Sequence, residues 1–192
     1  AVMITRALIP AAGRGQRAYP KTEYLPKVLL DIDGKPLIQR NIELLRDRLG
    51  VRDFTVIVGY MGERVRRALG DGAPLGVTIR YVECAHVERG LAAGMMLARD
   101  LFDAPFVTVL GDELYLDSNH ADLLAVAAEP YDAICAVQRG ASADQIRRNY
   151  AVRVEGGRIT ALVEKPVQVE NDLLGCGTYV FTPRIFDAIA SS

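Results

Sequence analysis

Glycines and cations gather in one short stretch of the sequence, residues 8–27. Gly13 and Gly15 follow the apolar run 7–9, which is typical of a buried strand. Four cations, opposed only by Glu23, fall within fourteen residues: Arg14, Arg17, Lys21 and Lys27. Glycines let a backbone approach a ligand closely, and triphosphate oxygens need backbone N–H donors and positive charge. The stretch therefore predicts a triphosphate site. The alternative is a glycine turn with solvated charges.

Two other phosphate motifs fit this stretch less well. The Walker A pattern G-x-x-x-x-G-K-[ST] is absent from the sequence. The dinucleotide pattern G-x-G-x-x-G/A matches residues 13–18 loosely, but it has to open a long helix. Pro20 and Pro26 would break such a helix, which also argues against a nicotinamide oxidoreductase. We expect an extended loop that wraps a ligand.

A carboxylate forms the second candidate site. Asp112 follows the apolar run 106–110 and Gly111, at the predicted end of a strand. Magnesium takes few carboxylates and fills its other positions with phosphate and water, so Asp112 beside a bound triphosphate suits Mg²⁺. An ordinary turn is the alternative. His86 and His120 are isolated in the sequence, so a histidine-based metal site is not expected.

Strands and helices alternate along the first part of the chain. We expect strands at 7–9, 28–32, 54–58, 77–82, 106–110 and 133–137, and helices at 38–49, 61–69, 91–102 and 120–128. A hairpin at 150–163, a strand at 178–181 and a helix from 183 to 190 follow. This order predicts a Rossmann-like three-layer α/β sandwich with a mainly parallel mixed sheet. Because ligands bind beyond the carboxyl ends of such strands, the glycine loop and Asp112 are expected on one rim.

Composition narrows the function classes. A chain of 192 residues, half of them hydrophobic, is expected to form one domain, and its net charge of −1 argues against a nucleic-acid partner. No apolar run is long enough to cross a membrane, and no signal peptide is recognised. The three cysteines have no metal spacing and are expected to be buried thiols of a cytoplasmic protein: Cys84, Cys135 and Cys176.

The pattern G-x-G-x-R, then a proline, then Pro26-Lys27, resembles the signature of sugar-1-phosphate nucleotidyltransferases, such as the glucose-1-phosphate uridylyl- and thymidylyltransferases. Gln16 stands where that family usually has Thr or Ser. The resemblance runs from Arg6 to Phe186 and implies the nucleotide-diphospho-sugar transferase type of fold. It also implies nucleotide contacts from Ala11, Ala12, Gly13, Arg14, Gly15, Gln16, Arg17, Lys27 and Gly90.

Further along the chain, Glu164-Lys165-Pro166 resembles the family motif in which Glu contacts sugar hydroxyls and Lys contacts the sugar phosphate. Tyr150 and Gly177 match neighbouring positions of the acceptor site. Gly175 stands where the family usually has Asn. The alternative for the Glu-Lys-Pro motif is a solvated strand end before a proline turn.

The resemblance implies an enzyme that transfers NMP from an NTP to a sugar 1-phosphate, giving an NDP-sugar and pyrophosphate. Its catalytic residues would be Arg17, Lys27 and Asp112, with Mg²⁺ held by Asp112. A cytidylyltransferase for a polyol or amino-alcohol phosphate and a non-catalytic nucleotide-sugar-binding domain are the alternatives. The choice of base among UTP, dTTP and CTP is left open. The oligomeric state is also left open, and a homo-oligomer is possible.

The family normally supplies a second metal-binding Asp beyond the helix that begins near Pro183. We therefore expect residues 1–192 to be a single nucleotidyltransferase domain with its C-terminal part truncated.

Overall fold

The computed structural model describes residues 3–127 and 130–192, and it divides into two compact units. The first unit holds the described residues up to Ile134 together with Tyr179–Ser192, and the second holds Cys135–Thr178. Both units carry predicted site residues. The expectation of a single domain with a truncated C-terminal part stays a prediction.

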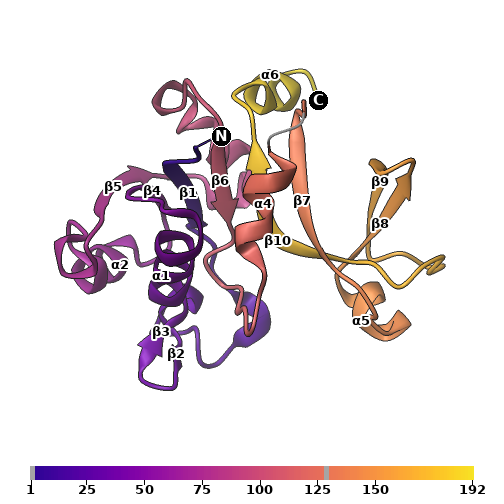
Figure 1. Ribbon diagram of the computed structural model, residues 1–192. Coiled ribbons are helices and arrows are strands. Elements are labelled where there is room, and N and C mark those ends of the chain that lie inside the picture. The colour runs from indigo at the N-terminus through magenta and orange to yellow at the C-terminus, as the bar shows by residue number, and fades with distance from the viewer. Residues whose placement is uncertain (1–2, 128–129) are drawn as a thin grey trace. The chain divides into compact units, whose positions relative to one another are not determined.

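A parallel sheet forms the centre of the first unit (Figure 1). Its strand order is β5-β4-β1-β6-β10, and all the pairings among the first four strands are parallel. Ala7 of β1 lies beside Phe54 of β4 and Val107 of β6. The strands are β1 (Arg6–Ala11), β4 (Asp53–Val58), β5 (Thr78–Glu83), β6 (Phe106–Val109) and β10 (Leu174–Phe181).

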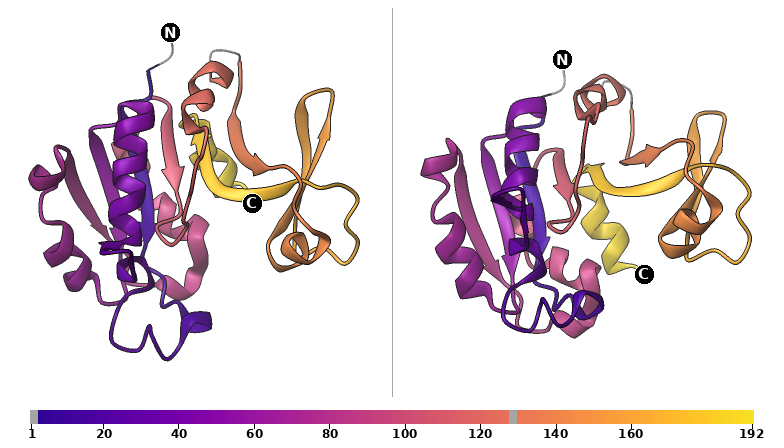
Figure 2. Two further views of the ribbon diagram at one scale, coloured as in Figure 1. Left: turned by 60° about the horizontal axis from the view of Figure 1, so that its bottom comes forward. Right: turned by 90° about the horizontal axis from the view of Figure 1, so that it is seen from below.

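Helices cover both faces of this sheet, as Figure 2 shows for α1 and the α3 segment. Side chains alternate along β1, so Ala7 and Ile9 pack in the cluster that contains α1 and α2, while Leu8 packs in the cluster of α3 and α6. The helices are α1 (Leu37–Leu49), α2 (Gly62–Leu69), α3 (Gly90–Met96) and α6 (Arg184–Ala190). The mainly parallel α/β sheet predicted from the sequence is confirmed.

Helix α1 follows its predicted pattern closely. Ile38, Ile42, Leu45 and Leu49 are all buried against the sheet. The helix ends at Gly50, whose φ of 76° is left-handed and whose N–H bonds back to the carbonyl of Arg46.

The strand predicted at 28–32 is wrong. Residues Lys27–Leu29 form a 3₁₀ turn, η2, and only β2 (Asp31–Ile32) is extended, paired with β3 (Lys35–Pro36). Val28 and Leu29 are buried in the turn. A short apolar run is compatible with any buried conformation, so its composition could not distinguish the turn from a strand.

Two predicted helices are shorter than expected. The 91–102 pattern divides into α3 and the 3₁₀ turn η5 (Arg99–Leu101), and the 120–128 pattern into η6 (His120–Asp122) and α4 (Leu123–Val126). Residue 128 lies outside the described residues. Two further 3₁₀ turns are η3 (Ala73–Leu75) and η4 (Val87–Arg89).

A hairpin dominates the second unit, as predicted. Strands β8 (Tyr150–Glu155) and β9 (Arg158–Glu164) pair antiparallel around Gly156 and Gly157, whose φ values of 56° and 79° suit a tight hairpin turn. Helix α5 (Ala143–Arg148) was not predicted, although Ser142 and Gln145 form a capping box at its start. The chain passes between the units in β7 (Ala133–Gln138) and in β10, which begins four residues earlier than expected.

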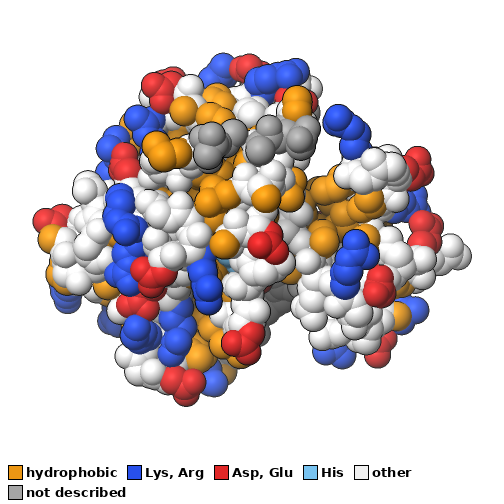
Figure 3. Space-filling model, in the orientation of Figure 1, with side chains coloured by type: hydrophobic (Ala, Val, Ile, Leu, Met, Phe, Trp, Pro, Cys, Tyr) orange, Lys and Arg blue, Asp and Glu red, His pale blue; other side chains and the backbone are white. Residues whose placement is uncertain are grey.

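Cationic and anionic side chains are interspersed over the face of the molecule that Figure 3 shows. Cys84 is buried as predicted, but Cys135 and Cys176 are only half-buried. None of the helices within the described residues is both long and apolar enough to cross a membrane.

Candidate active site

The glycine loop leaves the carboxyl end of β1 and contains no long helix. After Gly13 and Gly15 it forms the single 3₁₀ turn η1 (Gln16–Ala18), which agrees with the extended loop predicted from the prolines. Gly15 has a left-handed φ of 62°, and a methyl group there would come within 2.9 Å of Lys27 Cβ. The hydroxyl of Thr22 donates to the Gly15 carbonyl at 3.0 Å. Only glycine satisfies both the backbone angle and the close approach.

Lys27 and Asp112 meet beside this loop. Lys27 Nζ donates to Asp112 Oδ2 at 2.6 Å, although the two residues are 85 positions apart in the sequence. Lys27 belongs to the turn η2, and Asp112 lies in the turn that follows β6. Their side chains are 36% and 35% exposed, so the pair lies partly screened from water at the rim predicted for ligand binding.

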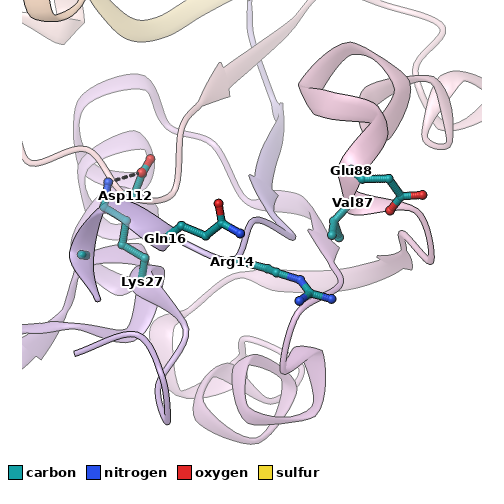
Figure 4. Close-up of a pocket in the computed structure, with 8 residues that line it drawn as sticks. Arg14, Gln16, Lys27, Val87, Glu88 and Asp112 are labelled. Atoms are coloured by element: carbon teal, nitrogen blue, oxygen red, sulfur yellow. Dashed lines mark hydrogen bonds and ion pairs between the residues drawn. The ribbon is translucent and has the colours of Figure 1, made fainter. Parts of the chain in front are cut away.

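A cavity of about 650 Å³ opens beside the Lys27–Asp112 pair. Figure 4 shows the pair on one side of this cavity, Val87 and Glu88 on the opposite side, and Arg14 and Gln16 between them. The volume is sufficient for a nucleotide. Its lining residues are Arg14, Gly15, Gln16, Ala18, Lys27, Val87, Glu88 and Asp112.

A second cavity of about 370 Å³ shares four lining residues with the first: Gly15, Lys27, Val87 and Asp112. It is more apolar, because Ile57, Leu91 and other aliphatic residues contribute to its walls. A flat aromatic ring suits such walls better than a charged phosphate does. The predicted nucleotide contacts that line this second cavity are Ala11, Ala12, Gly13, Gly15, Lys27 and Gly90.

Every predicted nucleotide-binding residue except Arg17 thus lines one or both cavities. The Arg17 side chain lies outside the described part of the structure. In the sequence, the segment 83–88 before Gly90 offered a carboxylate suited to the amino group of cytosine, but neither Val87 nor Glu88 was assigned to the site. The Glu88 carboxylate accepts a bond from its own backbone N–H, which lowers its pKa, and His86 lies 3.1 Å away. Only tertiary folding brings this carboxylate to the cavity.

Asp112 has an acidic neighbour in a different environment. Burial raises the pKa of the half-buried Glu113, and the charge of Asp112 raises it further, while Lys27 acts in the opposite direction. Asp112 itself is paired with a cation and faces the cavity. The two adjacent carboxyl groups therefore differ in environment, and Asp112 is the one that pairs with a cation at the cavity.

The Asp112 carboxylate is compatible with a magnesium ion only if phosphate and water supply the other ligands. The described residues contain no group of three or more His, Cys, Asp or Glu side chains that could hold a metal by themselves. A single carboxylate beside a cavity for phosphate is compatible with magnesium, which keeps several water and phosphate ligands. Asp112 would have to exchange its Lys27 partner for the metal.

Asn41 is a residue of this site that sequence analysis missed. It lies on α1 and is 1% exposed, and its amide donates to the turn that carries Asp112. The available signal was a polar residue beside Ile38 and Ile42 on the apolar face of a predicted helix. A buried polar side chain of this kind needs specific partners.

The predicted acceptor residues lie in the second unit. Lys165 has a left-handed φ of 44°, its backbone N–H donates to the Asn149 carbonyl at 2.7 Å, and its amine lies 3.6 Å from Glu164. Both of these side chains are exposed, at 63% and 80%. Gly177 lies within β10. A strand end at Lys165 is confirmed, while its contact with an acceptor stays a prediction.

Gly175 has a structural explanation in this unit. A methyl group at Gly175 would overlap the ring of Tyr150. The Tyr150 hydroxyl donates to the Cys176 carbonyl at 2.6 Å and lies 3.2 Å from Cys135 Sγ. An Asn side chain at position 175 would not fit while the Tyr150 ring is held there.

The fold and the cavity together define a protein class: an α/β protein that presents a glycine loop, a lysine and a carboxylate to one cavity large enough for a nucleotide. The nucleotidyl transferase family matches residues 6–192, almost the whole chain. The chain belongs to this family.

Named relatives and solved structures agree with that assignment. The chain is 33% identical over 95% of its length to the UTP–glucose-1-phosphate uridylyltransferase AglF of Haloferax volcanii, of which it covers 74%. It is 32% identical over 96% of its length to a glucose-1-phosphate thymidylyltransferase of Streptomyces antibioticus, but spans only 51% of that protein.

Two solved structures share the fold at 25% identity. A UDP-glucose pyrophosphorylase in complex with UDP-glucose has a TM-score of 0.84, covering 99% of this chain and 80% of that one. The inositol-1-phosphate CTP transferase of T. maritima has a TM-score of 0.81, covering 100% and 76%.

Proposed function

We propose that the protein transfers a nucleoside monophosphate from an NTP to a sugar 1-phosphate and releases pyrophosphate. One observation carries this proposal: in a chain of the nucleotidyl transferase family, Lys27 and Asp112 meet at 2.6 Å beside a glycine loop and a cavity of about 650 Å³. The family relatives named for uridylyl and thymidylyl transfer to glucose 1-phosphate support the same substrates.

In this reaction the sugar phosphate replaces pyrophosphate at the α-phosphorus of the NTP. An oxygen of the sugar phosphate forms a bond to the α-phosphorus of the NTP, and the bond from that phosphorus to the bridging oxygen of pyrophosphate breaks. The attacking oxygen is already anionic, so no strong general base is required. Positioning and neutralisation of charge therefore supply most of the rate enhancement.

The first unit would hold the NTP. Backbone N–H groups of the loop and the side chains of Arg14 and Lys27 are suited to the triphosphate, and Arg17 stays a predicted contributor. Asp112 is the residue suited to Mg²⁺, which would neutralise charge on the phosphates when it is bound. Lys27 would then leave Asp112 and donate to phosphate oxygens.

The second unit would supply contacts to the acceptor. Lys165 is proposed to bind the sugar phosphate and Glu164 to accept hydrogen bonds from sugar hydroxyls, with Tyr150 and Gly177 beside them. The left-handed backbone at Lys165 supports this assignment, since strained residues are frequent at ligand sites.

A cytidylyltransferase is the second candidate function. The Glu88 carboxylate lines the cavity, and its ionised form can accept a hydrogen bond from an amino group such as that of cytosine. The fold shared with an inositol-1-phosphate CTP transferase supports the same alternative.

A panel of substrates tests both candidates. Each of UTP, dTTP, CTP, ATP and GTP is combined with Mg²⁺ and either glucose 1-phosphate or inositol 1-phosphate, and pyrophosphate release is measured. We expect release that requires both substrates and is largest with UTP or dTTP and glucose 1-phosphate. Release with CTP and inositol 1-phosphate alone would favour the second candidate.

Thermal stability provides the accompanying binding measurement. A ligand at a hundred times its dissociation constant adds about 2.7 kcal/mol to the free energy of unfolding. Stabilisation by NDP-sugars without pyrophosphate release from any pair would instead identify a non-catalytic binding domain. Asp112→Asn is the matched control for both measurements.

A further inference from the structure

Asn41 is a polar side chain in an apolar environment. It lies on α1 between Ile38 and Ile42 and is only 1% exposed. Ile38 and Ile42 are fully buried aliphatic residues, so the amide of Asn41 is surrounded by the same apolar face of the helix. Burying an amide among aliphatic groups is unfavourable unless hydrogen bonds compensate for the lost water. The partners of Asn41 therefore explain why it is tolerated at this position.

Those partners belong to one turn, far away in the sequence. Asn41 Nδ2 donates to the carbonyl of Glu113 at 3.0 Å and lies 3.4 Å from the carbonyls of Leu110 and Gly111. The turn also has its own bond, from the Glu113 N–H to the Leu110 carbonyl at 3.1 Å. Asn41 thus contacts the backbone on both sides of Asp112.

The turn is tightly packed as well. A methyl group at Gly111 would lie 3.0 Å from Val28 Cγ1 and 3.3 Å from Ile9 Cγ2, so the backbone here is close to both η2 and β1. Val28 is the neighbour of Lys27 in the chain. The same small region therefore determines where the Asp112 carboxylate and the Lys27 amine lie.

We propose that Asn41 is a positioning residue: its amide holds the turn 110–113 so that the Asp112 carboxylate faces Lys27. The same positioning would present Asp112 to Mg²⁺, and this part of the proposal rests on the proposed function, whereas the part that concerns the Lys27–Asp112 contact does not. Asn41→Ala removes the donor and leaves three carbonyls without it. The turn can then rotate, and Asp112 moves away from Lys27.

The first experiment needs no ligand. The rate of reductive methylation of Lys27 is followed by mass spectrometry in the native protein and in Asn41→Ala, with Lys21 as an internal reference. Release of Lys27 from Asp112 should raise its methylation rate by about fivefold, the equivalent of one typical hydrogen bond. Leu45→Ala is the matched control, because Leu45 is buried on the same helix face and its side chain cannot donate a hydrogen bond.

The controls decide the interpretation of this first experiment. An unchanged Lys27 rate in Asn41→Ala, or an equal rise in Leu45→Ala, would overturn the proposal. If Asn41→Ala does not fold, the near-isosteric Asn41→Leu replaces it. A leucine at position 41 fills a similar space and cannot donate to the turn, so the Lys27 rate relative to Lys21 should rise in Asn41→Leu as well.

The second experiment uses Mg²⁺ and UTP. Calorimetry measures the Mg²⁺ concentration at half-saturation for UTP binding, which should rise about tenfold in Asn41→Ala and stay at the native value in Leu45→Ala. A native protein that binds no NTP would contradict the proposed function, while the methylation result would still decide the role of Asn41. An unchanged Mg²⁺ midpoint in Asn41→Ala would overturn the proposed effect on the metal.

Discussion

The two units carry their chemical groups in different ways. In the first unit Lys27 and Asp112 are 85 positions apart, lie 2.6 Å from each other and are about one third exposed. In the second unit Glu164 and Lys165 are adjacent in the sequence, lie 3.6 Å apart and are mostly exposed. A site built by folding is partly shielded from water, and its charges act more strongly than those on an open strand end. We therefore expect mutations in the first unit to have the larger effects.

The largest effect is expected for Lys27→Ala. Removing a single preorganised charge from the transition state slows turnover by about 10²–10³-fold. Asp112→Asn should have a similar effect and should also weaken the dependence of NTP binding on Mg²⁺. Steady-state pyrophosphate release and a magnesium titration are the measurements. Near-native rates in both variants, with the fold intact by circular dichroism, would contradict the assignment.

Gly15→Ala tests whether the loop backbone matters as much as its charges. The left-handed φ of 62° and the approach to Lys27 predict strain of about 1–3 kcal/mol, together with displacement of the Lys27 side chain. Gly13→Ala is the matched control for stability in the same loop, because a methyl group there has no neighbour within 4 Å. The free energy of unfolding, measured by chemical denaturation, should fall in Gly15→Ala much more than in Gly13→Ala, and UTP affinity should also fall in Gly15→Ala.

Lys165→Ala is expected to have a smaller effect than Lys27→Ala. The Lys165 side chain is 63% exposed, so its charge acts through a high dielectric, and we expect about a tenfold loss. The loss should appear in the KM of the sugar phosphate and in kcat, since the bound phosphate carries the attacking oxygen. Glu164→Gln should instead change which sugars are accepted. A reduced UTP affinity in Lys165→Ala, with normal acceptor kinetics, would assign the hairpin to the nucleotide.

The smallest expected effect is a change in the pH dependence of stability. The pKa of Glu113 is raised above its ordinary value of 4.5 by burial and by Asp112, so the folded state binds a proton that the unfolded state releases. The contribution of Glu113 to the free energy of unfolding should therefore be fully present below pH 4.5 and should be lost as the pH rises through the raised pKa. Glu113→Gln should remove this decrease, as measured by urea denaturation between pH 4 and 8. If Glu113→Gln showed the same dependence of stability on pH as the native protein, the raised pKa of Glu113 would be contradicted.

Local patterns predicted much of the fold because their physical causes are local. The spacing of Ile38, Ile42 and Leu45 is sufficient to predict α1, and Gly50 ends the helix by adopting a left-handed angle. Gly156 and Gly157 likewise adopt left-handed angles, which suit the tight turn of the hairpin. The run 28–32 was predicted wrongly because burial alone does not choose between a turn and a strand.

The sequence by itself determined the glycine loop, the cations within it and a carboxylate after a strand, because these depend on backbone angles and residue types at neighbouring positions. Only the tertiary structure decided that Asp112 contacts Lys27, that Glu88 lines the same cavity and that Asn41 holds the turn beside Asp112. The contact of Asp112 with Lys27 depends on β1 and β6 pairing side by side in the sheet, and the place of Glu88 depends on β5 pairing with β4, the other neighbour of β1. The burial of many side chains determines that pairing, and no short stretch of sequence contains it.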